Sequence, residues 1–139
     1  MPLSLGPGKI AGSEKVTVNL GLIDLGQVDL LVHEGFYSNR TDMIRTAIRN
    51  QLAVHGECVR ETVSRKKLVL GLETYTRSYL ETVRTAGQRL NIQVLGLVRI
   101  TVDVSPELAL DTIDSIAVLG ALQASAQVKS ALEAAGRIN

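Results

Sequence analysis

The stretch "EKVTVNLG" (residues 14–21) decides how the first third of the chain can fold. Polar and apolar residues alternate strictly along it, which is typical of a half-buried β-strand. One side of the predicted strand is apolar and consists of Val16, Val18 and Leu20. The other side is polar and consists of Lys15, Thr17 and Asn19. The neighbouring sequence offers no second strand to pair with it, so the strand needs a partner from elsewhere.

Two amphipathic helices are predicted directly after this strand. In "IDLGQVDLLVHEG" (residues 23–35), Asp24 and Gln27 resemble a capping box that starts a helix, and Gly35 is placed to end it. In "FYSNRTDMIRTAIRNQL" (residues 36–52), Asn39 with Asp42 three residues later predicts a second start. The apolar stripe of that second helix consists of Ile44, Ala47, Ile48 and Leu52.

A two-fold dimer gives the lone strand a partner. About forty residues with one strand and two helices cannot bury a sufficient core alone. Two copies of the strand can pair antiparallel, and the four helices can then close over the apolar side of the ribbon. The predicted dimer core is Val16, Val18, Leu20, Ile44 and Ile48. The polar side of the ribbon stays open, and a two-stranded ribbon fits the DNA major groove.

Residues 15–52 resemble the ribbon-helix-helix family of dimeric DNA-binding proteins, of the MetJ/Arc/CopG type. The resemblance rests on "KVTVNL", on the Gly35 turn and on "NRTDMIRTAIRNQL". It implies a DNA-binding dimer, most often a transcriptional repressor. The residues matching the family's base-contacting positions are Lys15, Thr17 and Asn19. Those matching its phosphate-contacting helix start are Ser38, Asn39, Arg40 and Thr41. A solvated strand face and ordinary helix capping are the plainer interpretations of the two sets.

Three similar tetrads predict a repeated unit in the second half of the chain. "VLGL" begins at Val69 and again at Val94, and "VLGA" begins at Val118. Each tetrad lies in an apolar strand pattern and precedes a segment that can form a helix. Three such strand–helix units indicate a parallel sheet or a short α/β solenoid. The glycine inside each predicted strand indicates a bend or a close backbone approach.

The predicted fold class is therefore mixed α/β, in consecutive parts. Residues 1–13 are expected to form a mobile N-terminal arm, and residues 14–56 the ribbon-helix-helix domain. Residues 57–66 are either a linker or a helical extension. Residues 67–139 are expected to form a small α/β domain that serves oligomerisation or binds an effector. This last part resembles no family that its sequence identifies.

Composition and motifs limit the remaining functions. The 139 residues are 45% hydrophobic and 3% aromatic, so a core must be aliphatic. A single cysteine, Cys58, favours a reducing, cytoplasmic setting and is expected to be half-buried and structural. No apolar run approaches the ~20 residues of a membrane span. His33, His55 and Cys58 offer too few ligands for a metal site. No catalytic motif and no cofactor motif is present, so an enzyme is not expected.

Three functions remain, in order of preference. The first is a sequence-specific, DNA-binding transcriptional regulator acting as a homodimer or higher homo-oligomer on double-stranded DNA. The second is a self-assembling scaffold protein that uses the ribbon only as a dimer clamp. The third and weakest is an antitoxin-like module, which the folded character of residues 67–139 disfavours.

Overall fold

The computed structural model describes residues 13–139, so the predicted arm at residues 1–13 lies outside the described residues except for Ser13. The described part contains helices α1 (Leu22–His33), α2 (Arg40–Val54), α3 (Gly56–Lys66), α4 (Arg77–Thr85), α5 (Pro106–Thr112) and α6 (Ala126–Ala134). Its strands are β1 (Val69–Tyr75), β2 (Leu90–Ile100) and β3 (Ile113–Gln123). The mixed α/β class is confirmed.

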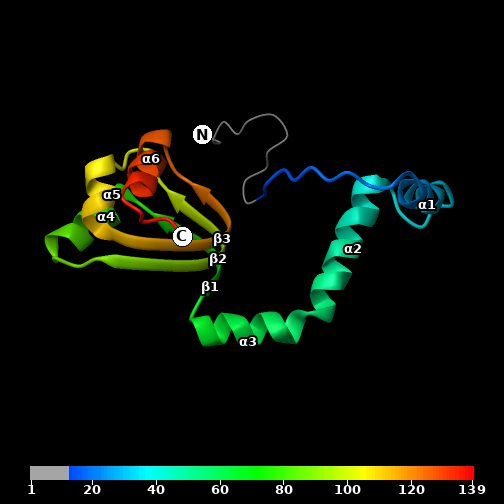
Figure 1. Cartoon of the computed structure of the whole chain (residues 1–139), viewed down its shortest axis with the longest axis horizontal. Helices are drawn as coiled ribbons and strands as arrows, with labels where there is room; N and C mark the ends of the chain where they lie inside the picture. The colour runs from blue at the N-terminus through cyan, green and yellow to red at the C-terminus, as the bar shows by residue number, and fades with distance from the viewer. Residues whose placement is uncertain (1–12) are drawn as a thin grey trace.

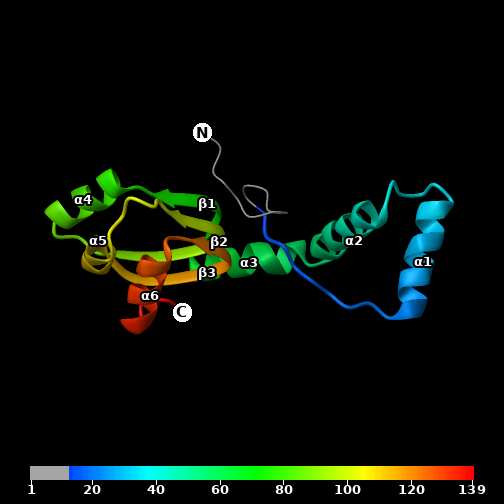
Figure 2. The same ribbon diagram turned by 90° about the horizontal axis from the view of Figure 1, so that it is seen from above.

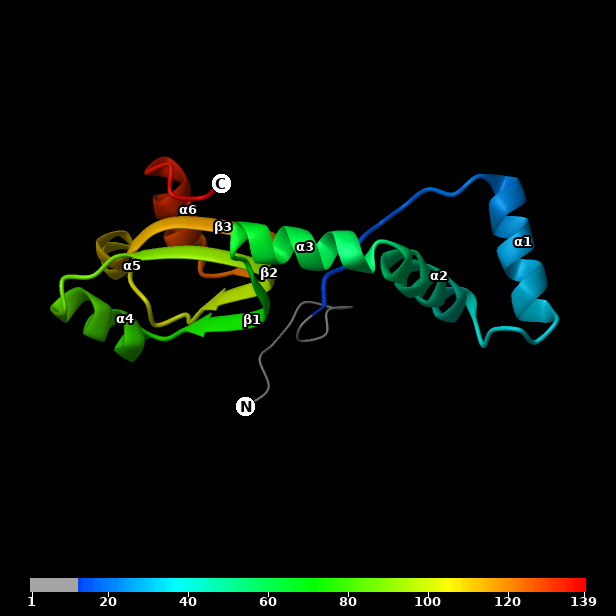
Figure 3. The ribbon, with the colours of Figure 1, turned by 90° about the horizontal axis from the view of Figure 1, so that it is seen from below.

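The first three helices extend away from the sheet. In Figure 1, α1, α2 and α3 follow one another as an arm, and the sheet with α4, α5 and α6 forms a separate body. Figures 2 and 3, seen from above and below, show the same separation. A linker or a helical extension was predicted for residues 57–66, and all of these residues lie in α3. The helix ends where Lys67 adopts a left-handed conformation at φ 54°.

The boundaries of α1 differ from the prediction at one end. The helix begins at Leu22, because Gly21 is already extended at the N-cap and its carbonyl accepts from Leu25 N–H at 2.9 Å. Asp24 was predicted to cap the helix, but it lies inside the first turn, and the N-cap residue is Gly21. The predicted stop is confirmed, since Gly35 has φ +85° and Phe36 N–H donates to the Leu31 carbonyl at 3.0 Å.

The predicted start of α2 is confirmed. The Asn39 side-chain oxygen accepts from the Asp42 N–H at 2.8 Å. The Asp42 carboxylate in turn accepts from the Ser38 N–H at 3.0 Å. These reciprocal bonds satisfy backbone donors that have no partner within the helix.

The predicted strand–helix units are also confirmed. The three strands are parallel in the order β1-β2-β3, and α4, α5 and α6 each follow one of them. The register places Val69 beside Val94, and Val94 beside Val118, so the sequence repeat is a spatial repeat. Each of these helices begins at a hydroxyl N-cap that accepts a backbone N–H: Thr76, Ser105 and Ser125.

The helices cover one face of the sheet. Their apolar residues pack on the inward side chains of the strands in one buried cluster. The buried members are Leu80, Ile92, Val94, Val98, Ile100, Val104, Leu108, Ala109, Ile113, Ile116, Val128 and Leu132. No described helix covers the opposite face, which we call the helix-free face. It consists of Leu70, Leu72, Leu95, Leu97, Leu119 and Ala121, from the alternate strand positions.

A row of glycines crosses the sheet at its middle. Gly71, Gly96 and Gly120 are register partners, with φ of +134°, +140° and +124°. A Cβ on Gly96 would overlap the Gly71 carbonyl oxygen, and a Cβ on Gly120 would overlap that of Gly96. The close backbone approach predicted from the sequence is therefore confirmed, and only glycine fits it.

Candidate nucleic-acid interface

The segment predicted to form the ribbon has no regular structure in the single chain. Residues 13–21 form neither helix nor strand, and residues 13–20 are exposed. A strand is defined by its ladder of hydrogen bonds, and this segment has no such ladder in the single copy. Lys15, Thr17 and Asn19, the predicted base contacts, are all solvent-exposed there. The strand itself therefore stays a prediction for the dimer.

The predicted dimer core is uncovered in the single chain. Val16 is 78% exposed, Val18 69% and Leu20 43%. On α2, Ile44 is 37% exposed and Ile48 54%. Within residues 13–66, Val28 is the only buried hydrophobic side chain. Residues 13–66 thus have almost no core of their own, and their apolar side chains are free for a partner to cover.

The predicted phosphate contacts surround the N-terminus of α2. Ser38, Asn39, Arg40 and Thr41 are adjacent and exposed. Asn39 is the N-cap residue, and the amide of Ser38 is bonded to the Asp42 side chain. A helix N-terminus presents unpaired N–H groups and a partial positive charge, and both favour an anion.

Arg40 has a partner that the sequence did not predict. Its Nε donates to Asp29 Oδ1 at 2.7 Å, and its Nη2 donates to Asp29 Oδ2 at 2.8 Å. This fork joins the start of α2 to α1. The hydrogen bond from Arg40 lowers the pKa of Asp29, and the same bond raises the pKa of Arg40. Asp29 lies eleven residues away across a turn, so no helical spacing rule could identify the pair.

The residues considered for a metal lie apart from any ligand cluster. The described residues 13–139 contain no group of three or more His, Cys, Asp or Glu side chains that could hold an ion. His55 lies 3.3 Å from the Gln51 side chain, between α2 and α3. Cys58 is exposed, which corrects the prediction of a half-buried structural thiol.

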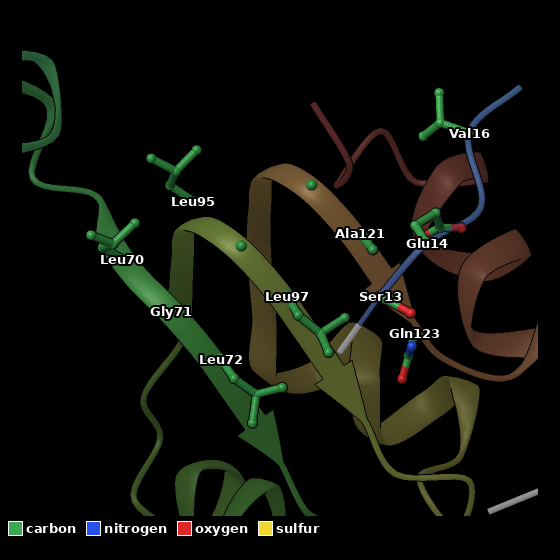
Figure 4. A pocket seen from close by; sticks show the side chains of 12 residues that line it. Ser13, Glu14, Val16, Leu70, Gly71, Leu72, Leu95, Leu97, Ala121 and Gln123 are labelled. Atoms are coloured by element: carbon green, nitrogen blue, oxygen red, sulfur yellow. The ribbon is translucent and has the colours of Figure 1, made fainter. Parts of the chain in front are cut away.

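A second candidate site lies on the helix-free face. An open hollow of about 550 Å³ is lined by Leu70, Leu72, Leu97 and Ala121 of the sheet, and by Ser13, Glu14 and Val16 of the N-terminal segment. Figure 4 labels these side chains. Its lining is largely apolar, and the polar side chains that reach it are Ser13, Glu14 and Gln123. A specific small-molecule site needs convergent polar groups that fix an orientation, and this hollow offers few.

Comparison with known protein families identifies the family of the chain. A family model described as the Ribbon-Helix-Helix transcriptional regulator family matches residues 11–129. The chain therefore belongs to that family. The match continues through β3 and into α6, so the family relationship includes most of the part that the sequence alone left unrecognised. The apolar strand repeats in residues 67–139 are built from common residues and have no distinctive motif.

Comparisons with curated proteins and with solved structures gave no significant match. Among the described residues, no helix is long and apolar enough to cross a membrane.

Proposed function

We propose that the protein is a sequence-specific DNA-binding transcriptional regulator, acting as a repressor through a two-stranded ribbon in the major groove. The observation that carries this proposal is membership of the Ribbon-Helix-Helix transcriptional regulator family over residues 11–129. A repressor of this kind needs no catalytic group and no cofactor, and its activity follows from occupying a DNA site.

The proposed unit is a homodimer formed by residues 14–56. The support is the exposure of Val16, Val18 and Leu20 in one copy, next to helices that bury almost none of their own apolar side chains. Pairing of two N-terminal segments would satisfy their backbone groups and cover these side chains together. Each fully covered aliphatic side chain would stabilise the dimer by about 1.5–3 kcal/mol before ordering costs.

Two sets of residues would divide the DNA contacts between them. Lys15, Thr17 and Asn19 alternate with the apolar row, so a ribbon that buries one row presents the other to the base edges. The N-terminus of α2, with Ser38, Asn39 and Thr41, would bind a backbone phosphate. Arg40 would add a charged contact there after leaving or sharing its bond to Asp29.

Residues 67–139 are proposed to join the dimers into larger assemblies. The helix-free face is the support, because parallel sheets are almost always covered on both faces. Here Leu70 is 69% exposed and Leu119 62% exposed. The same exposure is compatible with a scaffold protein, which is the second candidate. As a DNA-binding protein with one cysteine, the molecule is proposed to act in a reducing, cytoplasmic setting.

A footprint on genomic DNA tests the proposal. The purified protein should protect discrete sites, and its affinity should fall steeply as salt concentration rises. Protection of discrete sites would also exclude a pure scaffold role. If assemblies form but bind DNA neither specifically nor in a salt-dependent way, the scaffold function replaces the regulator.

A further inference from the structure

The parallel sheet has two edges that are open in the described part of the chain. Because the order is β1-β2-β3, β1 has no neighbour on its outer side. The outer side of β3 is occupied only near its beginning. There Ile116 N–H donates to the Arg137 carbonyl at 2.7 Å, and Asn139 N–H donates to the Ile116 carbonyl at 2.9 Å. Open edges present unpaired backbone donors and acceptors to any suitable strand.

The glycine row makes these two edges complementary in shape. The Gly71 carbonyl oxygen occupies the place where a Cβ on Gly96 would lie, and the Gly96 carbonyl oxygen occupies that place beside Gly120. By the same repeat, the Gly120 carbonyl faces the open edge of β3. At the other edge, a Cβ on Gly71 would meet nothing within 4 Å. One edge thus offers the projecting carbonyl, and the other offers a glycine with space before it.

The lengths of the strands agree with the same fit. β1 starts at Val69, which pairs with Val94, so residues 90–93 of β2 have no partner in β1. On β3, the equivalent early positions include Ile116, where residues 137–139 occupy the outer edge. The open part of β3 is therefore Val118–Gln123, and these residues are register equivalents of residues 69–74 in β1.

We propose that β1 of one copy adds, parallel and in register, to the open half of β3 of a second copy. In this contact Val69 of one molecule lies beside Val118 of the next, and Gly71 lies against the Gly120 carbonyl. The occupant is a second copy of this chain, because a strand with a glycine at positive φ in that register is what the β3 edge accepts. A strand with the same backbone conformation but any other residue at that position would place a Cβ on the carbonyl oxygen.

The contact is head-to-tail, so it repeats. Each molecule that uses its β1 edge leaves its own β3 edge open, which produces rings if the rotation closes and filaments if it does not. The inference deepens the assembly role proposed for residues 67–139 and does not depend on DNA binding. The contact would join the three-stranded sheets of successive molecules into one continuous sheet, as strand–helix units stack in solenoid proteins.

Engineered cysteines test the register in the full-length chain. Cys58→Ser removes the exposed native thiol. Leu70→Cys and Leu119→Cys are then added, at positions 69% and 62% exposed that would be neighbours across the contact. Within one molecule these positions are separated by β2, roughly 10 Å apart, which is too far for a disulfide. Under mild oxidation the double variant should form a ladder of covalent multimers. Mixing the two single variants should form cross-linked pairs.

The controls decide between this contact and other arrangements. Leu70→Cys combined with Gln123→Cys keeps the same face but shifts the register by four residues, roughly 13 Å, and should not cross-link. Cross-linking by Leu70→Cys alone would mean that two β1 edges meet, and would overturn the proposal. A mass above that of a dimer in light scattering without any 70–119 cross-link would leave assembly in place but overturn this contact. A dimer mass at high protein concentration would overturn both the contact and the assembly role.

Discussion

Arg40 donates two hydrogen bonds to Asp29, at 2.7 and 2.8 Å, and thereby fixes the start of α2 against α1. Both side chains are about half exposed, at 57% and 47%. Arg40 also follows directly on the N-cap residue of α2, where a phosphate is expected to bind. The same guanidinium is therefore placed for two roles, and the two roles predict different effects of substitution.

Arg40→Ala should weaken binding to all DNA sequences alike and lower the salt slope by about one, because it removes one phosphate contact. Asp29→Ala is the matched control, since it breaks the same bond but leaves the guanidinium free. Its DNA affinity should be unchanged or higher. Titration of each variant with DNA at several salt concentrations measures the affinity and the salt slope. Equal losses in the two variants would show that the bond is structural and that Arg40 does not touch phosphate.

Asp29 also reports on the state of this bond. Since the Arg40 bond lowers its pKa, any stability from the pair is present above the ordinary Asp pKa of about 3.9 and is lost as the pH falls through the lower folded value. The Asp29 titration followed by NMR should have a higher midpoint in Arg40→Ala. The midpoint should also rise when DNA binds, if the guanidinium then turns to a phosphate. An unchanged midpoint in the complex would mean that Arg40 stays with Asp29.

Val18→Asp tests the ribbon. In the single chain Val18 is 69% exposed, so a carboxylate there should cost a monomer little. In the proposed dimer the same carboxylate would be buried and unpaired, which costs several kcal/mol. We expect the variant to lose dimerisation and DNA binding together, as measured by sedimentation and by DNA titration. Thr17→Asp is the control for the opposite row and should remain dimeric. A dimeric Val18→Asp protein that binds DNA would refute the ribbon.

Thr17→Ala and Asn19→Ala should change specificity. Each would remove a contact to a base edge and reduce discrimination at one position by about 1–3 kcal/mol. Binding selections from randomised DNA with each variant measure this directly. If Asn19→Ala leaves the preferred site unchanged while Arg40→Ala alters it, the two sets of contacts have been assigned the wrong way round.

A fragment ending at Glu57 separates the two proposed levels of assembly. It should remain a dimer, because the ribbon and its helices would form their own core. It should bind single sites more weakly and lose cooperative binding to adjacent sites, since linked dimers raise the effective concentration of the next contact. Light scattering of the fragment and the full chain provides the comparison. If the fragment and the full chain are both dimers, residues 67–139 do not join dimers together, and effector binding becomes the favoured role for them.

The parts predicted well from the sequence are those set by local chemistry or by repetition. Asn39 with Asp42 identifies a helix start because both partners lie within four residues. The tetrads at residues 69, 94 and 118 identify adjacent strands because repeated units stack in register. The Arg40–Asp29 bond depends on the angle between two helices, and no local pattern encodes it. The strand predicted at residues 15–20 would depend on a second molecule, and the single chain has no regular structure there.

Gly96→Ala and Gly71→Ala form a matched pair that tests the glycine row. Both residues have nearly the same strained conformation, with φ of +140° and +134°. Alanine should therefore cost each about 1–3 kcal/mol from backbone strain. At Gly96 the new Cβ would also overlap the Gly71 carbonyl, whereas at Gly71 it would meet open space. Denaturant unfolding at low protein concentration should show Gly96→Ala to be less stable by about a further 1–3 kcal/mol.

At high protein concentration Gly71→Ala should fold but fail to assemble beyond a dimer, because its Cβ would then meet the Gly120 carbonyl of the next copy. Equal stabilities of the two variants would show that strain alone accounts for the row, and normal assembly of Gly71→Ala would remove the steric basis for the strand contact.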